Sequence, residues 1–206
     1  MPSFPHVSLS EHGSTIPFRV PECIICRQND KEDSSYPVDI IAENHLWMVH
    51  HMFCGPPPGS SAEWGTPNAE TGGDSDLPGH LMFHSQRHVH GPADFTDEEA
   101  GNFIFAIQHV ERLLLDVTGA ERIYTILVGE TGPHLHAHLI PRYSDEQLAA
   151  MGVSVDLGSA MGVFDLYRAV GAGDHHPADP VEVARVNSEM KARLAAQPLP
   201  MRGARF

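Results

Sequence analysis

The chain of 206 residues carries 13 Lys and Arg against 27 Asp and Glu, so its formal net charge is −14 at pH 7. This acidic balance excludes a generally basic nucleic-acid-binding protein, and we expect no nucleic-acid partner. A hydrophobic content of 41% at this length suffices for a normal core, which predicts one globular domain with additions.

The chain lacks the sequence signals of a membrane or secreted protein. No run approaches the ~18 consecutive apolar residues of a membrane helix, and the first residues have neither region of a signal peptide. Cys23 and Cys26 form a close pair that leaves Cys54 as an odd thiol, which does not suit a secreted disulfide framework. We therefore expect a cytoplasmic protein without a membrane partner.

The first part of the chain predicts an irregular arm, a hairpin, a long loop and a strand. Four prolines and no hydrophobic period predict the arm at residues 1–22. Two short apolar runs, 38–41 and 46–49, predict the two strands of the hairpin. Residues 54–78 are rich in Pro, Gly and Ser and predict an inserted loop, and residues 81–83 predict a buried strand.

The clearest helix signal follows. Thr96 and Glu99 have the spacing of a capping box, and apolar residues then recur at helical spacing until Gly119 provides a stop. Residues 122–129 and 134–142 predict two further strands. We therefore predict an α+β fold in which an antiparallel sheet meander is covered by one long helix.

The C-terminal region is predicted to be helical at both ends. Ser144 can cap a short helix through Leu148, and Asp179 before Pro180 begins a helix through about Ala196. The segment between these helices contains Gly171 and is predicted to be a loop. The sequence thus predicts three parts: an arm at 1–22, a domain at 23–145 with the inserted loop 54–78, and a helical extension at 146–206.

The last predicted strand carries three histidines, His134, His136 and His138, that alternate with apolar residues. Because side chains on a strand alternate between its faces, the three imidazoles would share one face. The outer two would be about 13 Å apart, too far to share one ion. At least one of them must therefore have a role other than binding that metal. The alternative without function is a polar strand edge that faces solvent.

The Cys23-x-x-Cys26 pair has the spacing of half a zinc site. His88 and His134 are the candidates that would complete a set of two thiolates and two imidazoles. Two reduced cysteines without metal remain an alternative. A redox pair is less favoured because no βαβ pattern follows.

Taken in order, the motifs resemble those of the histidine triad family of nucleotide hydrolases and transferases. The resemblance covers about residues 20–145. It is carried by Cys23-x-x-Cys26, the hairpin, Pro78-Gly79-His80-Leu81-Met82-Phe83, Arg87-His88-Val89, Phe95-Thr96-Asp97-Glu98-Glu99 and His134-x-His136-x-His138-Leu-Ile-Pro-Arg.

The resemblance implies a covalent mechanism on a small nucleotide or phosphorylated substrate. His136 would attack the α-phosphorus to form a nucleotidyl-imidazole, and His138 would bind the phosphoryl oxygens or the leaving group. In the zinc-containing branch His134 is a metal ligand rather than a catalyst, and here it joins the metal set Cys23, Cys26, His88 and His134. The resemblance also implies a homodimer.

Other residues would bind the substrate. Val49-His50-His51-Met52 stands where the family usually has an acidic residue for the ribose hydroxyls, so His50 or His51 would take that role. Thr131 is the one hydroxyl in the short loop before the triad, and Arg142 either contacts phosphate or forms a surface ion pair. Other histidines flank the site in sequence and are candidates to support it: His45, His80, His84 and His90.

Three functions fit these patterns. The leading one is a zinc-containing enzyme that cleaves or transfers a nucleoside-phosphate group through a phospho-histidine. The alternative is a transferase or lyase of a specialised biosynthetic pathway, acting on a non-nucleotide or atypical nucleotide substrate. The third is a zinc-stabilised binding protein, which the presence of His136 and His138 disfavours because zinc binding does not need them.

Overall fold

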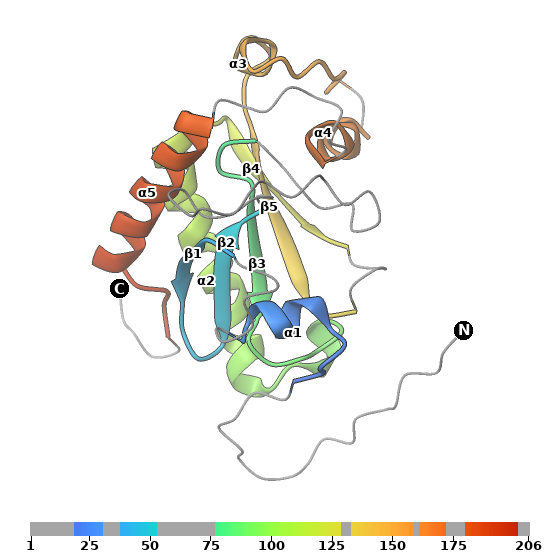
Figure 1. Cartoon of the computed structure of the whole chain (residues 1–206), viewed down its shortest axis with the longest axis vertical. Helices are drawn as coiled ribbons and strands as arrows, with labels where there is room; N and C mark the ends of the chain where they lie inside the picture. The colour runs from blue at the N-terminus through green and yellow to red at the C-terminus, as the bar shows by residue number, and fades with distance from the viewer. Residues whose placement is uncertain are drawn as a thin grey trace, which may run out of the picture.

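The computed structural model describes residues 19–30, 38–52, 77–128, 133–158, 161–171 and 180–201. Five strands form one antiparallel sheet in the order β1-β2-β3-β5-β4: β1 (Ile40–Glu43), β2 (Trp47–His51), β3 (Leu81–Ser85), β4 (Arg122–Leu127) and β5 (His136–Arg142). The helices are α1 (Ile24–Gln28), α2 (Asp97–Thr118), α3 (Asp145–Ala150), α4 (Gly162–Gly171) and α5 (Pro180–Ala196), with a short 3₁₀ turn at Pro92–Asp94. The α+β prediction is confirmed (Figure 1).

The predicted hairpin is β1 and β2. Its turn closes because the side-chain oxygen of Asn44 accepts hydrogen bonds from the backbone N–H groups of Leu46 and Trp47, at 2.9 and 2.8 Å. Trp47 lies on the sheet face that packs against α2, and its indole N–H donates to Asn102 of that helix at 2.8 Å. The hairpin is thereby fixed to the long helix.

The capping box of α2 is confirmed. The Thr96 hydroxyl accepts from the backbone N–H of Glu99, and the Glu99 carboxylate accepts from the backbone N–H of Thr96 at 2.8 Å. Arg87 donates to the same carboxylate at 2.7 Å, so this buried charge is paired. Gly119 ends the helix in the left-handed conformation, at φ 64°.

The C-terminal region differs in part from its prediction. The short helix capped by Ser144 and the last helix are present as α3 and α5, but the segment predicted as a loop contains α4. This helix packs Leu166, which is fully buried, into a cluster with Ile140 and Tyr143. The glycines of this segment predicted a loop. Packing against the sheet instead stabilises a short helix there.

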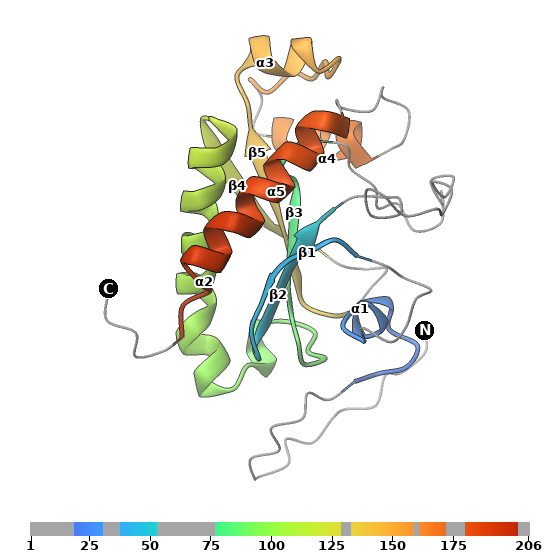
Figure 2. The ribbon, with the colours of Figure 1, turned by 60° about the vertical axis from the view of Figure 1, so that its left-hand side comes forward.

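Helix α5 shares the core of the sheet. Val186, Met190 and Leu194 are buried in the same cluster as the apolar residues of α2 and of the sheet, and α5 runs beside α2 (Figure 2). The smaller helices α3 and α4 lie at the end of the molecule away from α1 (Figure 1). The C-terminal region therefore helps to hold the sheet in place.

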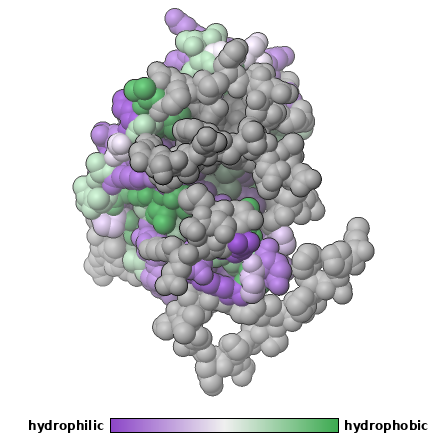
Figure 3. All heavy atoms as spheres, in the orientation of Figure 1, coloured by the Kyte–Doolittle hydropathy of each residue, from purple (hydrophilic) through white to green (hydrophobic). Residues whose placement is uncertain are grey.

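Several predicted segments lie outside the described residues, namely most of the arm at 1–22, residues 53–76 of the inserted loop, and Thr131. On the face shown in Figure 3, hydrophilic and hydrophobic residues of the described ranges are mixed. Within those ranges, no helix combines the length and the apolar character that crossing a bilayer requires.

Gly79 joins the inserted segment to β3 and permits a close contact with α2. It has φ 75°, and a Cβ at this position would lie 2.9 Å from side-chain atoms of both Leu114 and Thr118. Gly119 is a matched control, because it also has a positive φ but a Cβ there would meet nothing within 4 Å.

We expect Gly119→Ala to lower the free energy of unfolding by about 1 kcal/mol through backbone strain alone. Gly79→Ala should lower the free energy of unfolding by the same amount and by about 1–3 kcal/mol more, because the new methyl group overpacks the contact with α2. Urea denaturation of the two variants measures the difference. Equal losses would show that α2 moves away from the new methyl group without cost.

Candidate metal centre and active site

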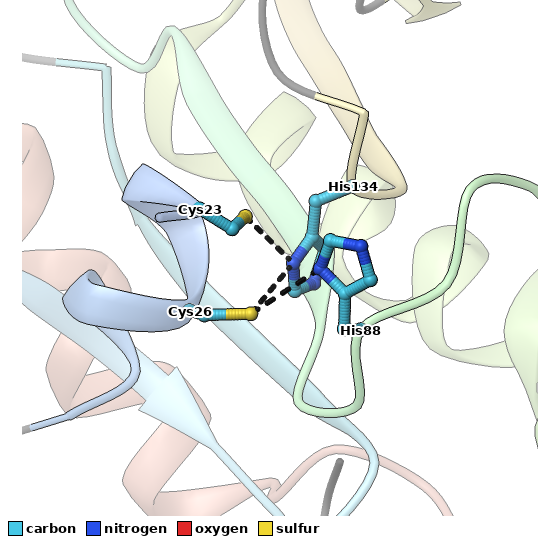
Figure 4. Close-up of side chains that lie close together, drawn as sticks. All are labelled: Cys23, Cys26, His88 and His134. Atoms are coloured by element: carbon cyan, nitrogen blue, oxygen red, sulfur yellow. Dashed lines mark hydrogen bonds between the residues drawn. The ribbon is translucent and has the colours of Figure 1, made fainter. Parts of the chain in front are cut away.

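Four side chains from three separate segments meet at one end of the sheet. Cys23 precedes α1 and Cys26 lies one helical turn later, so both sulfurs point to the same side (Figure 4). His88 lies in the loop after β3, and His134 lies just before β5. The four ligand atoms all lie within 4.8 Å of one another. The structure therefore brings together the four residues of the predicted metal set.

The distances in this cluster fit a tetrahedral zinc site. Nδ1 of His134 lies 3.5 Å from Sγ of Cys23 and 3.5 Å from Sγ of Cys26, and Nδ1 of His88 lies 3.3 Å from Sγ of Cys26. Zinc–sulfur and zinc–nitrogen bonds of about 2.3 and 2.0 Å place neighbouring ligand atoms roughly 3.5 Å apart in a tetrahedron. Two thiolates and two imidazoles are also the donor set that zinc prefers.

The surrounding groups prepare the ligands for a metal. Nε2 of His134 donates to the carbonyl oxygen of Ser85 at 2.9 Å, which leaves the lone pair of the neutral ring on Nδ1, facing the sulfurs. The backbone N–H of Val20 donates to the sulfur of Cys26 at 3.4 Å. The hydrogen bond between the two sulfurs lowers the pKa of the Cys23 thiol and raises that of the Cys26 thiol, so the pair favours one thiolate in the absence of a metal. The residues present therefore fit a zinc ion.

The prediction that all three triad histidines lie on one strand is wrong for His134. The N–H of Leu135 donates to the carbonyl oxygen of Val89 at 2.6 Å, and β5 begins only at His136. The chain at His134 therefore follows the loop after β3 and reaches the cysteine pair. This departure from the strand separates the metal ligand His134 from the other two histidines.

Four histidines line the face of the sheet opposite α2. His136 pairs directly with His84 of the neighbouring strand, while His138 and His50 both lie opposite Met82. Because directly opposed residues on an antiparallel sheet point to the same face, His50, His84, His136 and His138 share that face. His84 lies directly opposite His136, and the only sequence signal for this position was that residue 84 follows the predicted strand 81–83.

His136 has the most accessible imidazole of this group. Its side chain is half-buried, whereas the side chains of His50, His84 and His138 are buried. Nδ1 of His136 donates to the carbonyl oxygen of His134 at 2.7 Å, so the lone pair of the neutral ring is on Nε2. Burial lowers the pKa of His136, which keeps the ring neutral at pH 7. A neutral, oriented and accessible imidazole is a competent nucleophile.

His138 contacts His80, one of the histidines that the sequence marks as candidates to support the site. Its Nδ1 lies 3.2 Å from Nε2 of His80, which directly precedes β3. The rings of His136 and His138 lie 5.3 Å apart, centroid to centroid. Burial lowers the pKa of His138 to about 3 and that of His80 as well, so both rings are neutral.

The predicted substrate-binding residues fall in different places. His50 lies on the same sheet face as His136, opposite α2. His51 points to the other face, where its Nε2 lies 3.2 Å from the carbonyl oxygen of Leu77. Arg142 is six residues along β5 from His136, roughly 20 Å away on an extended strand. Its guanidinium pairs with Asp145 at 2.8 Å, so the ion-pair alternative describes Arg142 better than a phosphate contact. The structure thus brings His50 to His136 and leaves His51 and Arg142 apart.

Solved structures of histidine triad proteins are similar to this chain over most of its length. A zinc-bound histidine triad family protein from Mycobacterium smegmatis shares 14% identity at a TM-score of 0.52, with 85% of this chain and 97% of that chain covered. A hypothetical histidine triad nucleotide-binding protein from Sulfolobus tokodaii shares 10% identity at 0.52, with 89% and 99% covered. A histidine triad protein from Marinobacter aquaeolei shares 15% identity at 0.51, with 79% and 91% covered.

The sequence itself gives no such match, either with protein-family models or with curated proteins. At these identities the structural similarity is evidence about the fold. The antiparallel five-stranded sheet, the long helix across it and these similar structures together show that the chain has the fold of the histidine triad proteins.

Proposed function

We propose that this protein is a histidine triad enzyme that cleaves or transfers a nucleoside-phosphate group through a covalent phospho-histidine on His136. The observation that carries the proposal is the orientation of His136, whose Nδ1 is bound to the carbonyl oxygen of His134 and whose Nε2 is free to attack. The similarity to histidine triad structures, one of them named as nucleotide-binding, supports it.

The reaction proceeds in two displacements. In the first, the Nε2 lone pair of His136 forms a bond to phosphorus while the bond from phosphorus to the leaving group breaks, and the leaving group takes the electron pair. In the second, water or another acceptor attacks the same phosphorus, and the electron pair of the phosphorus–nitrogen bond returns to Nε2. A neutral ring is required in the first step, which agrees with the lowered pKa of His136.

His138 would assist at the phosphoryl group. When His80 donates from Nε2 to Nδ1 of His138, Nε2 of His138 carries the hydrogen of the neutral ring. That hydrogen can be donated to a phosphoryl oxygen or to the leaving group. His80 is thus a positioning residue for His138.

The metal set would hold zinc in a structural role. Zinc bound by Cys23, Cys26, His88 and His134 would cross-link α1 to the sheet and contribute folding free energy. Because the carbonyl of His134 orients His136, the position of His134 also affects the nucleophile.

The second candidate function is a transferase or lyase with an atypical or non-nucleotide substrate. It is favoured by His51, which stands near the expected place of a ribose-binding carboxylate but is turned into the core face of the sheet. Without that carboxylate, recognition of a nucleoside would depend on other groups.

We also propose that the protein acts as a homodimer in the cytoplasm, without nucleic-acid or membrane partners. Strand β4 lies at one edge of the sheet, and among the described residues no further strand pairs with its outer side. Leu127 of this strand and Ile104 of α2 are exposed apolar side chains, which supports a second copy as the partner at this edge. A reducing compartment would keep Cys23 and Cys26 as thiols.

The function is tested by incubating the zinc-loaded protein with adenosine and guanosine phosphoramidates and with dinucleoside polyphosphates. We expect release of nucleoside monophosphate from at least one of them, measured by chromatography. If none is turned over while a phosphorylated non-nucleotide is, the transferase or lyase alternative replaces the leading proposal.

A further inference from the structure

Part of the C-terminal region packs on the sheet face that carries His136 and His138. Side chains alternate along β5, so Ile140 points to the same face as these two histidines. Ile140 is fully buried in a cluster with Leu166 of α4, and Leu157, in the segment before α4, packs against that cluster. The face that carries the catalytic histidines therefore ends, beyond His138, at residues of the C-terminal region.

Strand β4 contributes to the same boundary. Ile126 pairs directly with His138. Tyr124, two residues earlier on the same strand, pairs directly with Ile140. Because directly opposed residues of an antiparallel pair point to the same face, both side chains lie on the face of His138, where they pack against the cluster that contains Leu166. We call four of these residues the end wall of the site: Ile126, Ile140, Leu157 and Leu166.

The neighbours of His138 on this face are apolar on three sides. Met82 of β3 lies directly opposite it on one side and Ile126 of β4 on the other. Ile140 follows it along β5, and His136 precedes it. Successive side chains on one face of a strand are about 7 Å apart, so a group that begins at His138 reaches Ile140 within the length of a short alkyl chain. A group held by His138 would therefore contact methyl and methylene groups.

The charges near the end wall do not suit a chain of phosphate groups. Strand β5 has no Lys or Arg between His136 and Arg142. The guanidinium of Arg142 is already paired, with Asp145 at 2.8 Å and with Glu121 at 3.7 Å. Moving several negative charges from water to an apolar surface without cations is unfavourable, and the net charge of −14 adds repulsion. An uncharged group would meet neither cost.

We propose that the end wall selects substrates in which the phosphorus attacked by His136 bears a compact, uncharged and apolar leaving group. The inference rests on the proposed function and names a substrate class for it, an alkyl or aryl amide or ester of the phosphoryl group rather than a polyphosphate. As the bond from phosphorus to Nε2 of His136 forms, the bond to the leaving group breaks. That group takes the electron pair and, with a proton from water, departs as a neutral amine or alcohol. The hydroxide that remains attacks phosphorus in the second displacement.

The experiment compares ligands that differ in the group attached to the phosphoryl oxygen. One pair is the n-butyl ester of adenosine monophosphate and adenosine diphosphate, and the other is n-butyl phosphate and pyrophosphate. All are titrated calorimetrically into the zinc-loaded protein. We expect the butyl member of each pair to bind about tenfold more tightly or better, because its alkyl chain leaves water. Equal or tighter binding of the diphosphates, or no binding of any of the four ligands, would overturn the proposal.

A charge placed in the end wall tests the role of β4. Ile126→Lys adds a cation beside His138 and should reverse the preference in favour of the diphosphates. Thr125→Lys is the matched control, because this exposed neighbour pairs with Leu139 and points to the other face of the sheet. We expect it to keep the preference of wild type. An unchanged preference in Ile126→Lys, or the same reversal in both variants, contradicts the proposal.

Gly162→Ala tests the C-terminal region, and it does so even if Ile126→Lys does not fold. A Cβ at residue 162 would lie 2.6 Å from Cα of Leu157 and 2.7 Å from the backbone oxygen of Asp156, so the segment that carries Leu157 must shift. Gly152→Ala is the control, because a Cβ there would meet nothing within 4 Å. We expect Gly162→Ala to lose most of the preference for the butyl ligands and Gly152→Ala to keep it. A full preference in Gly162→Ala would remove the C-terminal region from the site.

The outcomes distinguish this inference from the proposed function. Binding of the four ligands does not require turnover, so failure of the proposed function would appear as no phospho-histidine adduct on His136, with the preference for butyl ligands still measurable. Failure of the inference alone would appear as an adduct that forms from adenosine triphosphate as fast as from the n-butyl phosphoramidate of adenosine monophosphate.

Discussion

Cys23→Ser is expected to lose most of the bound zinc and several kcal/mol of folding free energy. The sulfur of Cys23 is one of four ligand atoms that converge from α1, the loop after β3 and the segment before β5. A structural zinc site contributes its binding free energy to folding, so removing one ligand weakens both together. The same substitution should lower turnover, because the carbonyl of His134 orients His136.

Elemental analysis and thermal unfolding measure this result. Cys54→Ser is the matched control, because it makes the same chemical change at the cysteine outside the Cys23-x-x-Cys26 pair of the sequence, and we expect one zinc per chain and an unchanged melting temperature. Chelation of wild type should reproduce the loss of stability seen in Cys23→Ser. A full equivalent of zinc with unchanged stability in Cys23→Ser would remove Cys23 from the metal set.

His136→Ala is expected to reduce turnover by about three orders of magnitude or more while the fold and the zinc content stay unchanged. The imidazole of His136 is half-buried and its nitrogen atoms are not among the metal ligands, so its removal leaves the cluster intact. Loss of a covalent nucleophile typically removes most of the catalysed rate.

The direct observation is a covalent adduct in the intact mass of wild type, trapped with a substrate whose second displacement is slow. The adduct should be absent in His136→Ala and present in His45→Ala, in which an exposed imidazole paired with Glu98 is removed. Appreciable turnover in His136→Ala would mean that water or another residue attacks phosphorus.

Features formed by residues that are close together in the chain could be predicted from the sequence. The capping box at Thr96 and the turn at Asn44 are formed by residues that are three or fewer positions apart, so their side-chain chemistry predicts them. The metal set was predictable for a different reason, since thiolates and imidazoles at such spacing have few other uses in a buried place. Here the structure brings the ligands together.

Other features could not be predicted from a pattern along the chain. The alternation of histidines with apolar residues predicts a strand that includes His134. In the structure the N–H of Leu135 donates to the carbonyl oxygen of Val89, and His134 lies before the start of β5. His50 and His51 are neighbours in sequence, and only the pairing of β2 with β3 decides which of them faces His136. His84 belongs to no motif in the sequence, and only the pairing of β3 with β5 places it directly opposite His136.

The sequence by itself determined the fold class and the long helix with its cap, and it predicted the four residues that meet in the Cys/His cluster, because these follow from residue type and short-range spacing. The tertiary structure alone decided that His50 rather than His51 lies on the same sheet face as His136, that Arg142 lies at the far end of β5, and that α4 is a helix. These outcomes depend on strand register and on packing between distant segments, and such contacts are not encoded in any local pattern.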